Sequence, residues 1–316
     1  MNNFAVSIRK FESGSDINED SAVAEPSFIA VSDGAGGGGL FADRWSSFLT
    51  SHLPDSPISS ADELERWLTG IWEQFYDEAE AEAQKRGGIY LDKFYDEGAF
   101  ATLVAVWQSA PDKFSWISFG DSVAFAFNRR THSLQHSFSS LQDFSRPPAL
   151  INCKDPLRKE RFCSGTFTAD PDTVVFCASD ALSHYFIMRY EAEHQDDERL
   201  ASDLFAVANG LSRNAIYVNS LLADRPSSSL ADELERVFFP LASSGNYEAL
   251  FSAHMQHLEQ AHLLGHDDYS FAMFVPQSLS ADAPMPTLSR KEVRWFRRCL
   301  RRSPFASVVR LKLAVL

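Results

Sequence analysis

Four aspartates in this sequence stand directly at the ends of apolar, strand-like segments. Asp33, Asp121 and Asp180 each follow such a segment, and Asp267 comes just before one. In an antiparallel sheet the C-terminal end of one strand lies beside the N-terminal end of its neighbour, so Asp267 can meet the other three at one edge. A single aspartate after a strand is most often a turn residue. Four with the same placement favour a functional cluster.

The chemistry of such a cluster follows from its charge. Carboxylates that converge repel one another, so the arrangement persists only where cations neutralise it. Oxygen ligands suit Mg²⁺ or Mn²⁺ better than Zn²⁺. Two such ions about 3.5–4 Å apart can activate a shared water for in-line attack on phosphorus. The four aspartates therefore predict divalent-metal chemistry, with phosphate-ester hydrolysis as a reaction that it supports.

Five short motifs occur in an order that matches a known family. Together they resemble the metal-dependent protein phosphatases, the type 2C serine/threonine phosphatases, and most of all their bacterial branch. The resemblance spans roughly residues 1–277 and implies hydrolysis of phosphoserine or phosphothreonine in proteins. It also implies a phosphoprotein substrate and a cognate serine/threonine kinase. The motifs are Asn18–Ser21, Asp33–Gly37, Gly120–Ser122, Ala178–Ala181 and Asp267–Ser270.

The resemblance implies a set of metal ligands. Asp33 would bridge two Mn²⁺ or Mg²⁺ ions, and the carbonyl of Gly34 would bind one of them. Asp180 and Asp267 would complete the pair, while Asp121 would hold a third, weaker ion. The nucleophile would be a water activated by the two metal ions, with no covalent phosphoenzyme.

Glu19 and Asp20 would hold metal-bound waters, but phosphate capture departs from the family pattern. Many members carry a phosphate-binding Arg where this sequence has Ser15, and the nearest basic residues are Arg9 and Lys10. Two further positions differ: Ala181 replaces the usual Gly, and Val123 stands where Arg often occurs. An active phosphatase is expected because the metal ligands are intact. The alternatives are a pseudophosphatase or phosphoprotein-binding regulatory module, and a metal-dependent hydrolase of small phosphate esters.

Other motifs favour weaker interpretations. Residues 34–39 fit the pattern GxGxxG after a strand, but Asp33 would repel a pyrophosphate, and no clear βαβ unit follows. His254, His257, His262 and His266 cluster, yet no fourth zinc ligand is evident, so surface or partly packed histidines are expected. Serine-hydrolase chemistry is disfavoured because no nucleophile elbow is present.

The elements that must position these residues are read from hydrophobic periodicity. Strand-like runs are adjacent in pairs, which favours an antiparallel α+β arrangement over a doubly wound sheet. The resemblance adds two antiparallel sheets packed as a central sandwich, with helices on both outer faces. A helix is expected from a Ser60/Glu63 capping box to Gly87. Further helical regions are expected at about 182–222, from 229 to just before Pro240, and at 247–264. The strands are expected at 27–32, 101–107, 114–119, 123–127, 173–178 and 270–275.

Charge divides the 316-residue chain unevenly. The net charge is −14, but residues 290–316 carry nine Lys or Arg and one acid, which leaves residues 1–289 at −22. The strongly negative charge of residues 1–289, the acidic body of the chain, predicts that the protein has no nucleic-acid partner. The predicted organisation is a phosphatase domain at 1–277, a proline-bearing linker at 278–289 and a basic tail at 290–316. The tail could dock on the acidic body, or contact a partner or an anionic membrane surface. A cytoplasmic location is expected, since no apolar run could span a membrane, no secretory signal is visible and the four cysteines form no CxxC pair.

Overall fold

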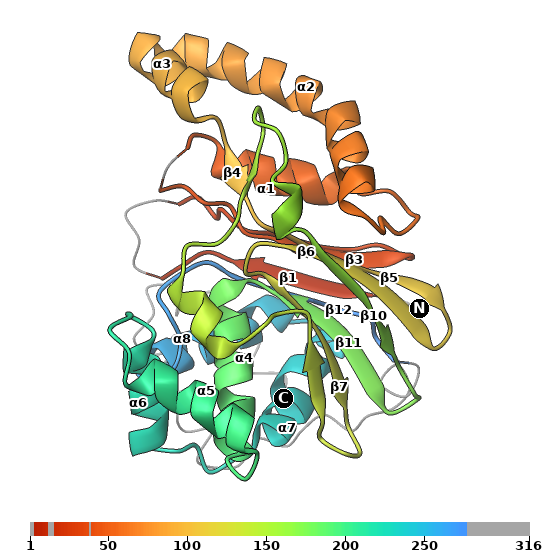
Figure 1. Ribbon diagram of the computed structural model, residues 1–316, viewed down its shortest axis with the longest axis vertical. Helices are drawn as coiled ribbons and strands as arrows, with labels where there is room; N and C mark the ends of the chain where they lie inside the picture. The colour runs from red at the N-terminus through yellow and green to blue at the C-terminus, as the bar shows by residue number, and fades with distance from the viewer. Residues whose placement is uncertain (1–2, 12–15, 38, 277–316) are drawn as a thin grey trace, which may run out of the picture. The chain divides into compact units, whose positions relative to one another are not determined.

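Two antiparallel five-stranded sheets form the centre of the fold (Figure 1). The computed structural model describes residues 3–11, 16–37 and 39–276. The first sheet has the order β1 (Phe4–Ile8), β12 (Tyr269–Met273), β11 (Thr173–Ala178), β7 (Val123–Asn128), β8 (Leu134–His136). The second has the order β10 (Cys163–Thr168), β6 (Lys113–Phe119), β5 (Leu103–Ala110), β3 (Phe28–Ser32), β2 (Ser21–Ala24). A small pair, β4 (Phe100–Ala101) and β9 (Ile151–Asn152), completes the strands of the described residues.

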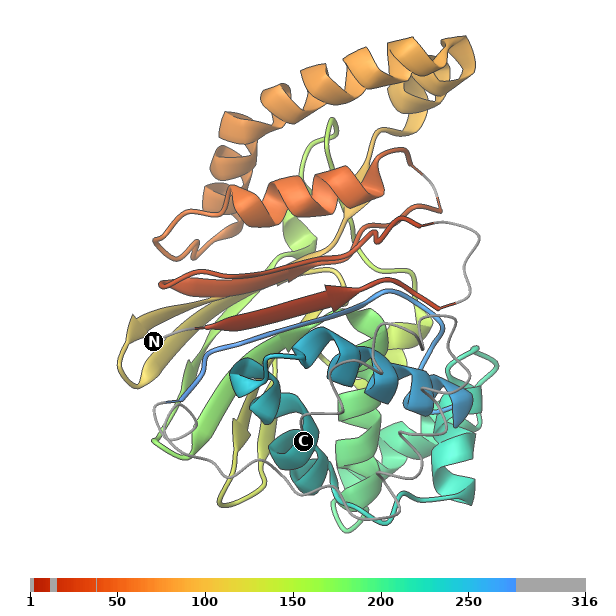
Figure 2. The same cartoon turned by 180° about the vertical axis from the view of Figure 1, so that it is seen from behind.

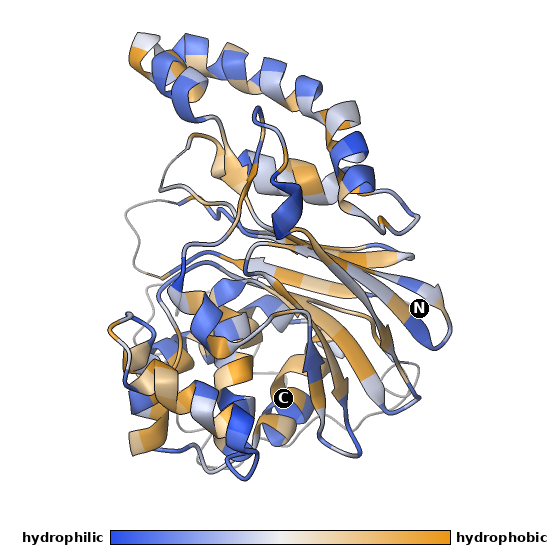
Figure 3. Cartoon of the chain, in the orientation of Figure 1, coloured by the Kyte–Doolittle hydropathy of each residue, from blue (hydrophilic) through white to orange (hydrophobic). Residues whose placement is uncertain are grey.

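The two sheets pack face to face through alternate side chains. In β3, Ile29 and Val31 point into the layer between the sheets, whereas Phe28 and Ala30 point toward the helices outside. This alternation is the period of two that a strand imposes on its side chains. Because both faces are covered, all five residues of β3 are buried, and the strand reads as a continuous apolar run. Figure 3 shows apolar residues, coloured orange, along much of the length of the strands.

Helices cover the outer face of each sheet (Figures 1 and 2). Those over the second sheet bury one apolar core, which includes Trp45 and Phe75, and those over the first sheet bury another, which includes Phe186 and Phe238. The predicted α+β sandwich with helices on both outer faces is therefore confirmed. Over the second sheet lie α1 (Ala42–Ser51), α2 (Ala61–Arg86) and α3 (Gly88–Glu97); over the first lie α4 (Asp180–Glu193), α5 (Glu198–Ala208), α6 (Ala215–Ala223), α7 (Leu230–Glu233) and α8 (Tyr247–Gln260).

The structure corrects several predicted boundaries. The region expected at 182–222 is three helices, α4, α5 and α6, separated by loops at 194–197 and 209–214. Pro240 does not end the helical run that starts after Ser229, because it occupies the first turn of a 3₁₀ helix, Phe239–Ser243, where its missing N–H is not needed. Ser60 caps α2 as predicted, but the carboxylate of Glu63 accepts hydrogen bonds from Ser59 instead of returning to Ser60.

Three of the sequence-based expectations concern residues outside the described part of the chain: the substitution at Ser15, the linker at 278–289 and the basic tail at 290–316. Within the described residues, none of the helices combines the length and the apolar character that crossing a membrane requires.

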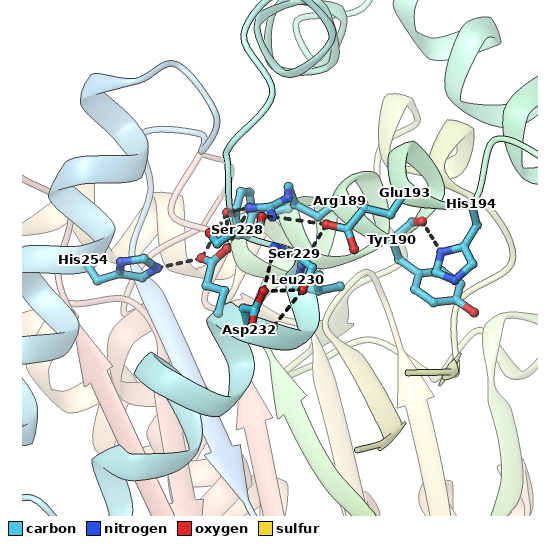
Figure 4. Close-up of polar contacts among 11 residues, drawn as sticks. Arg189, Tyr190, Glu193, His194, Ser228, Ser229, Leu230, Asp232 and His254 are labelled. Atoms are coloured by element: carbon cyan, nitrogen blue, oxygen red, sulfur yellow. Dashed lines mark hydrogen bonds and ion pairs between the residues drawn. The ribbon is translucent and has the colours of Figure 1, made fainter. Parts of the chain in front are cut away.

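A buried polar cluster fixes helix α4, whose first residue is Asp180. We call it the Arg189 cluster: Tyr185, Arg189, Glu233 and His254, with the more exposed Glu193 at its edge. Figure 4 labels Arg189, Glu193 and His254. The Arg189 side chain is only 3% exposed and lies 2.7 Å from Glu233, which also accepts from Tyr185 and bonds to His254 at 2.7 Å. Burial alone would raise the pKa of Glu233, but the hydrogen bond and charge of His254 and the charge of Arg189 lower it overall. The cluster thus ties α4 to α7 and α8.

Glu233→Ala should destabilise the protein by about 3–5 kcal/mol, because it leaves a buried guanidinium without its main counter-charge. The double variant Arg189→Met/Glu233→Leu should cost less than this single change, since both buried charges disappear together. Urea unfolding followed by circular dichroism measures both. The matched control is Asp172→Ala, which breaks an exposed pair with Arg130 at 3.1 Å and should cost about 0–1 kcal/mol. Equal costs for Glu233→Ala and Asp172→Ala would contradict the anchoring role.

Candidate metal centre

Three of the predicted aspartates converge at one edge of the sandwich. One carboxylate oxygen from each of Asp33, Asp121 and Asp180 lies within 4.8 Å of the other two. Asp33 follows β3 of the second sheet, and Asp180 begins α4 directly after β11 of the first. Asp121 lies on the short segment that crosses from β6 in the second sheet to β7 in the first. The cluster is therefore built from both sheets.

The strand register explains this convergence. Ala178, near the end of β11, pairs with Val123 at the start of β7 and with Phe271 near the start of β12, and both pairings are antiparallel. The residue that follows β11 and those that precede β7 and β12 must then lie at the same edge. Those residues include Asp180, Asp121 and Asp267, as the sequence analysis expected.

Thr102 joins the two halves of the cluster, and its role was not predicted. Its hydroxyl accepts a hydrogen bond from the backbone N–H of Asp33 at 3.0 Å and bonds to the hydroxyl of Ser122 at 2.6 Å. Gly120 passes close beside it with φ of 107°, and a Cβ there would come within 2.6 Å of the Thr102 methyl. The glycine of the Gly120–Ser122 motif is thus required by both its backbone conformation and its close approach.

Asp20 and Asp267 border the three-carboxylate group. Neither belongs to that group, yet the charges of both raise the pKa of Asp33 and Asp180. Asp20 is 8% exposed, and burial, followed by the charges of Asp268 and Asp267, raises its pKa to about 8. Asp268 is turned away: it is 2% exposed and accepts hydrogen bonds from the backbone N–H groups of Lys10 and Glu19, both at 2.7 Å. The two adjacent aspartates therefore have different roles. Asp267 lines the cavity, and Asp268 holds the N-terminal segment in place.

The electrostatics of the cluster are those of uncompensated negative charge. Burial, then the neighbouring carboxylates, raise the pKa of Asp33 and Asp180 well above the usual range. Burial raises the pKa of Asp121 to about 6, with a further increase from Asp267. Buried oxygens of Asp20 (Oδ2) and Asp121 (Oδ1) accept no hydrogen bond from any described residue. Orphaned buried carboxylate oxygens in an all-oxygen donor set fit a hard divalent cation such as Mn²⁺ or Mg²⁺.

The glycine-rich loop after Asp33 makes room for Glu19. A Cβ on Gly36 would lie 1.9 Å from the Glu19 carboxylate, and one on Gly34 would lie 2.4 Å from the Glu19 carbonyl oxygen. Gly34 also donates its N–H to that carbonyl at 3.1 Å and lines the cavity. The Glu19 carboxylate lies 3.6 Å from Lys10 Nζ, and burial raises its pKa. The dinucleotide interpretation fails here, because β3 pairs antiparallel with both of its neighbours.

A cavity of about 700 Å³ opens over the cluster and is lined by Glu19, Asp33, Gly34, Asp121, Asp180 and Asp267. Among its described lining residues, the Arg and Lys side chains are Arg146 and Arg213. Neither was predicted, because no local pattern marks a residue that tertiary packing brings to a cavity. Ala181 lines the cavity, whereas Val123 is buried in β7 and has no side-chain nitrogen for a phosphate.

The predicted histidine cluster is divided among separate contacts. His254 belongs to the Arg189 cluster, and His266 bonds to Glu259 at 2.6 Å. No group of possible metal ligands found among the described residues contains a histidine. The expectation of surface or partly packed histidines therefore agrees with the structure.

Comparisons with known proteins give similarity at the level of folds. No protein-family model and no curated protein sequence matches the chain. The solved structures that match include bacterial serine/threonine phosphatases, the family that the sequence motifs resemble. Stp1 from Staphylococcus aureus has 14% identity and a TM-score of 0.45, and the match covers 86% of this chain and 94% of that one.

Two further proteins, represented by three structures, have similar sequence identities and TM-scores. The Mycobacterium tuberculosis phosphatase PstP has 14% identity and a TM-score of 0.46, with 86% and 96% of the two chains covered. PppA, described as a regulatory component of the type VI secretion system in Pseudomonas aeruginosa, has 16% identity and a TM-score of 0.44, with 86% and 97% covered. A catalytic domain of PstP, also 16% identical at a TM-score of 0.44 with 86% and 96% covered, is in complex with two manganese ions. Similarities this low assign no activity to the present chain.

The metal-free protein should lose stability as the pH rises from 6.5 to 8. A carboxylic acid whose pKa is higher in the folded state holds a proton that the unfolded chain releases, so stability falls until the folded pKa is passed. One or two such protons correspond to about 2–4 kcal/mol over this range, or on the order of 5–10 °C in Tm. Differential scanning fluorimetry after EDTA treatment measures the change.

Mn²⁺ should raise the Tm more at pH 8 than at pH 6.5, because it competes with protons for the same oxygens. Asp33→Asn should reduce both the pH dependence and the Mn²⁺ effect. Asp196→Asn, at an exposed position outside the cavity, should change neither. A Tm that rises toward pH 8 without metal, or ignores Mn²⁺ at both pH values, would contradict the proposed electrostatics.

Proposed function

We propose that this protein is a metal-dependent phosphatase that hydrolyses phosphoserine and phosphothreonine in proteins, with Mn²⁺ or Mg²⁺ as its cofactor. The observation that supports this most strongly is the group formed by Asp33, Asp121 and Asp180 at the wall of a cavity. Asp121 is buried, Asp33 and Asp180 are half-buried, and the three lack neutralising partners close enough to keep their pKa values normal. An acidic cluster inside a cavity that also holds arginines suits a metal ion and a phosphate together.

The metal would be held by Asp33, Asp180, Asp267 and the carbonyl of Gly34, with Asp121 as a ligand of a further ion. When bound, divalent ions neutralise phosphate charge and make a water molecule more acidic. The residues of the chain provide the rigid frame: Thr102 holds the backbone of Asp33 and the crossing segment of Asp121.

Glu19 and Asp20 would orient waters at the edge of the site. Gly36 leaves the space that the Glu19 carboxylate occupies, and Lys10 lies beside that carboxylate. The hydroxyl groups of Ser179 and Ser270 oppose the rise in the pKa of Asp20. The pKa of both carboxyl groups is raised, and that of Asp20 rises to about 8, which suits a group that exchanges protons with water near neutral pH.

A phosphoprotein substrate fits the open cavity and implies a cognate serine/threonine kinase. The excess of acidic residues in the body disfavours nucleic-acid substrates. The alternative, a pseudophosphatase that binds phosphoproteins without turnover, was suggested by the absence of Arg at Ser15. The presence of Arg146 and Arg213 in the cavity weakens that argument, because a phosphate would still meet cationic groups.

Hydrolysis of p-nitrophenyl phosphate and of a phosphothreonine peptide should require Mn²⁺ or Mg²⁺ and should stop with EDTA. Asp33→Asn should reduce kcat on the order of 100–1000-fold, the usual effect of removing a central electrostatic group. Asp121→Asn should cost less at saturating Mn²⁺, because it would hold only the weaker ion. The matched control, Asp196→Asn, makes the same change outside the cavity and should retain normal activity.

Two results would count against this proposal. Near-normal turnover by folded Asp33→Asn would refute the central role of that carboxylate. Binding of Mn²⁺ and phosphopeptides by the wild type without any turnover would favour the pseudophosphatase.

A further inference from the structure

The site needs a cationic group for phosphate, and the expected candidates are otherwise engaged. Arg9 is paired with Asp16, and Lys10 lies 3.6 Å from Glu19. Neither Arg9 nor Lys10 lines the cavity over the carboxylates. Arg146 does line it, but its guanidinium lies 3.1 Å from Asp143 and its side chain is largely exposed. Phosphate capture by this chain must therefore be sought elsewhere in the cavity wall.

Arg213 has the required position. It lies in the 209–214 loop between α5 and α6, lines the cavity and is exposed to it. It shares the lining of this cavity with Asp33, Asp121, Asp180 and Asp267, so its guanidinium faces the same space as the acidic cluster. The backbone carbonyl of Arg213 accepts a hydrogen bond from Ile216, but its guanidinium forms no ion pair or hydrogen bond among the described residues, which leaves its five N–H donors available.

The loop that carries Arg213 is fixed against the rest of the site. The buried side chain of Asn214 donates a hydrogen bond to the carbonyl of Phe144 at 3.1 Å. Tyr217 and His184 form an edge-to-face contact at 6.1 Å, and His184 contacts Phe144 in the same way at 5.4 Å. A long side chain on such a loop starts from a defined point, which reduces the entropy lost when it binds a ligand.

His184 supplies a second, independent indication of a ligand. It lines the same cavity, is 6% exposed, and its Nε2 has no hydrogen-bond partner among the described residues. It lies one helical turn after Asp180 on α4. A buried ring nitrogen at a cavity wall without a protein partner indicates a group that a bound molecule satisfies.

We propose that Arg213 is the phosphate-binding residue of this site, with Nε2 of His184 as a second polar contact for the bound phosphate. The inference rests on the proposed phosphatase function and names the residue that replaces the Arg absent at Ser15. Arg suits the role because its planar guanidinium forms paired, charge-assisted hydrogen bonds to two phosphate oxygens. The alternative role for Arg213 is a simple counter-charge to the carboxylates, which predicts a different response.

The test compares Arg213→Ala, Arg213→Lys and the matched control Arg225→Ala. Arg225 lies just beyond the other end of α6 and contacts Gln195, outside the cavity. With Mn²⁺ saturating, isothermal titration calorimetry measures the Kd for inorganic phosphate, and steady-state kinetics measures KM and kcat for p-nitrophenyl phosphate and a phosphothreonine peptide. Arg213→Ala should raise the phosphate Kd and both KM values about 10–100-fold, with a smaller change in kcat. Arg213→Lys should recover part of the affinity, and Arg225→Ala should match the wild type.

The outcomes separate this inference from the proposed function. Normal turnover by the wild type with unchanged phosphate Kd and KM in Arg213→Ala would overturn the inference alone. The same unchanged Kd with tighter Mn²⁺ binding would identify Arg213 as a counter-charge and also overturn it. Weakened phosphate binding by Arg213→Ala in a protein without turnover would support the inference while the phosphatase proposal fails. A wild type that binds no phosphate with Mn²⁺ present would overturn both.

Discussion

Mutual repulsion among carboxylates held close together in the wall of a cavity is the constraint on which the rest of this structure depends. Asp33, Asp121 and Asp180 are closer together than unneutralised charges would settle on their own, and Asp20 and Asp267 add to the repulsion. The surrounding fold must hold them there, since nothing in the cluster attracts one member to another. The sandwich does so by anchoring each acidic segment to an element with its own apolar core.

The anchors are hydrogen bonds formed by the backbone of the acidic segments and by residues next to the clustered aspartates. Thr102 binds the backbone of Asp33 and the hydroxyl of Ser122, and Asp268 binds the backbone of Lys10 and Glu19. On the far side, the Arg189 cluster fixes the helix that begins with Asp180. These contacts use none of the carboxylate oxygens of Asp33, Asp121 and Asp180, although Asp180 accepts a hydrogen bond from the backbone N–H of Ala181. The rigidity of the frame and the availability of the ligands therefore come largely from different atoms. A preorganised site requires this separation, because ligands that bonded to one another could not bind an ion.

Short apolar runs in the sequence predicted the antiparallel α+β arrangement, and the family resemblance added the sandwich. The same runs show where strands end, so antiparallel pairing predicted that Asp33, Asp121, Asp180 and Asp267 would meet; the first three form the group, and Asp267 borders it. It did not predict β10, because that edge strand is largely exposed and lacks an apolar face. Helix α1 was also missed, since the residue at its N-cap, Phe41, offers no capping side chain. Thr102 and Arg213 could not be recognised, because one lies beside an ordinary strand and the other reaches the site only through the packing of α5 and α6. The distinct roles of Asp267 and Asp268 likewise could not be predicted, because they depend on how the chain is oriented at the start of β12.

The pairing of β1 with β12 has a consequence for synthesis on the ribosome. The hydrogen bond from the backbone of Lys10 to Asp268 joins residues 258 positions apart, and β12 is the neighbour of β1 in its sheet. A growing chain must therefore carry β1 as an unpaired segment until β12 has been translated and has left the exit tunnel. Closing so long a loop is slow compared with local helix formation. The acidic cluster is bordered by Asp267, which directly precedes the β12 segment, so its surroundings are completed only after β12 has left the tunnel, and until then β1 remains open to chaperones.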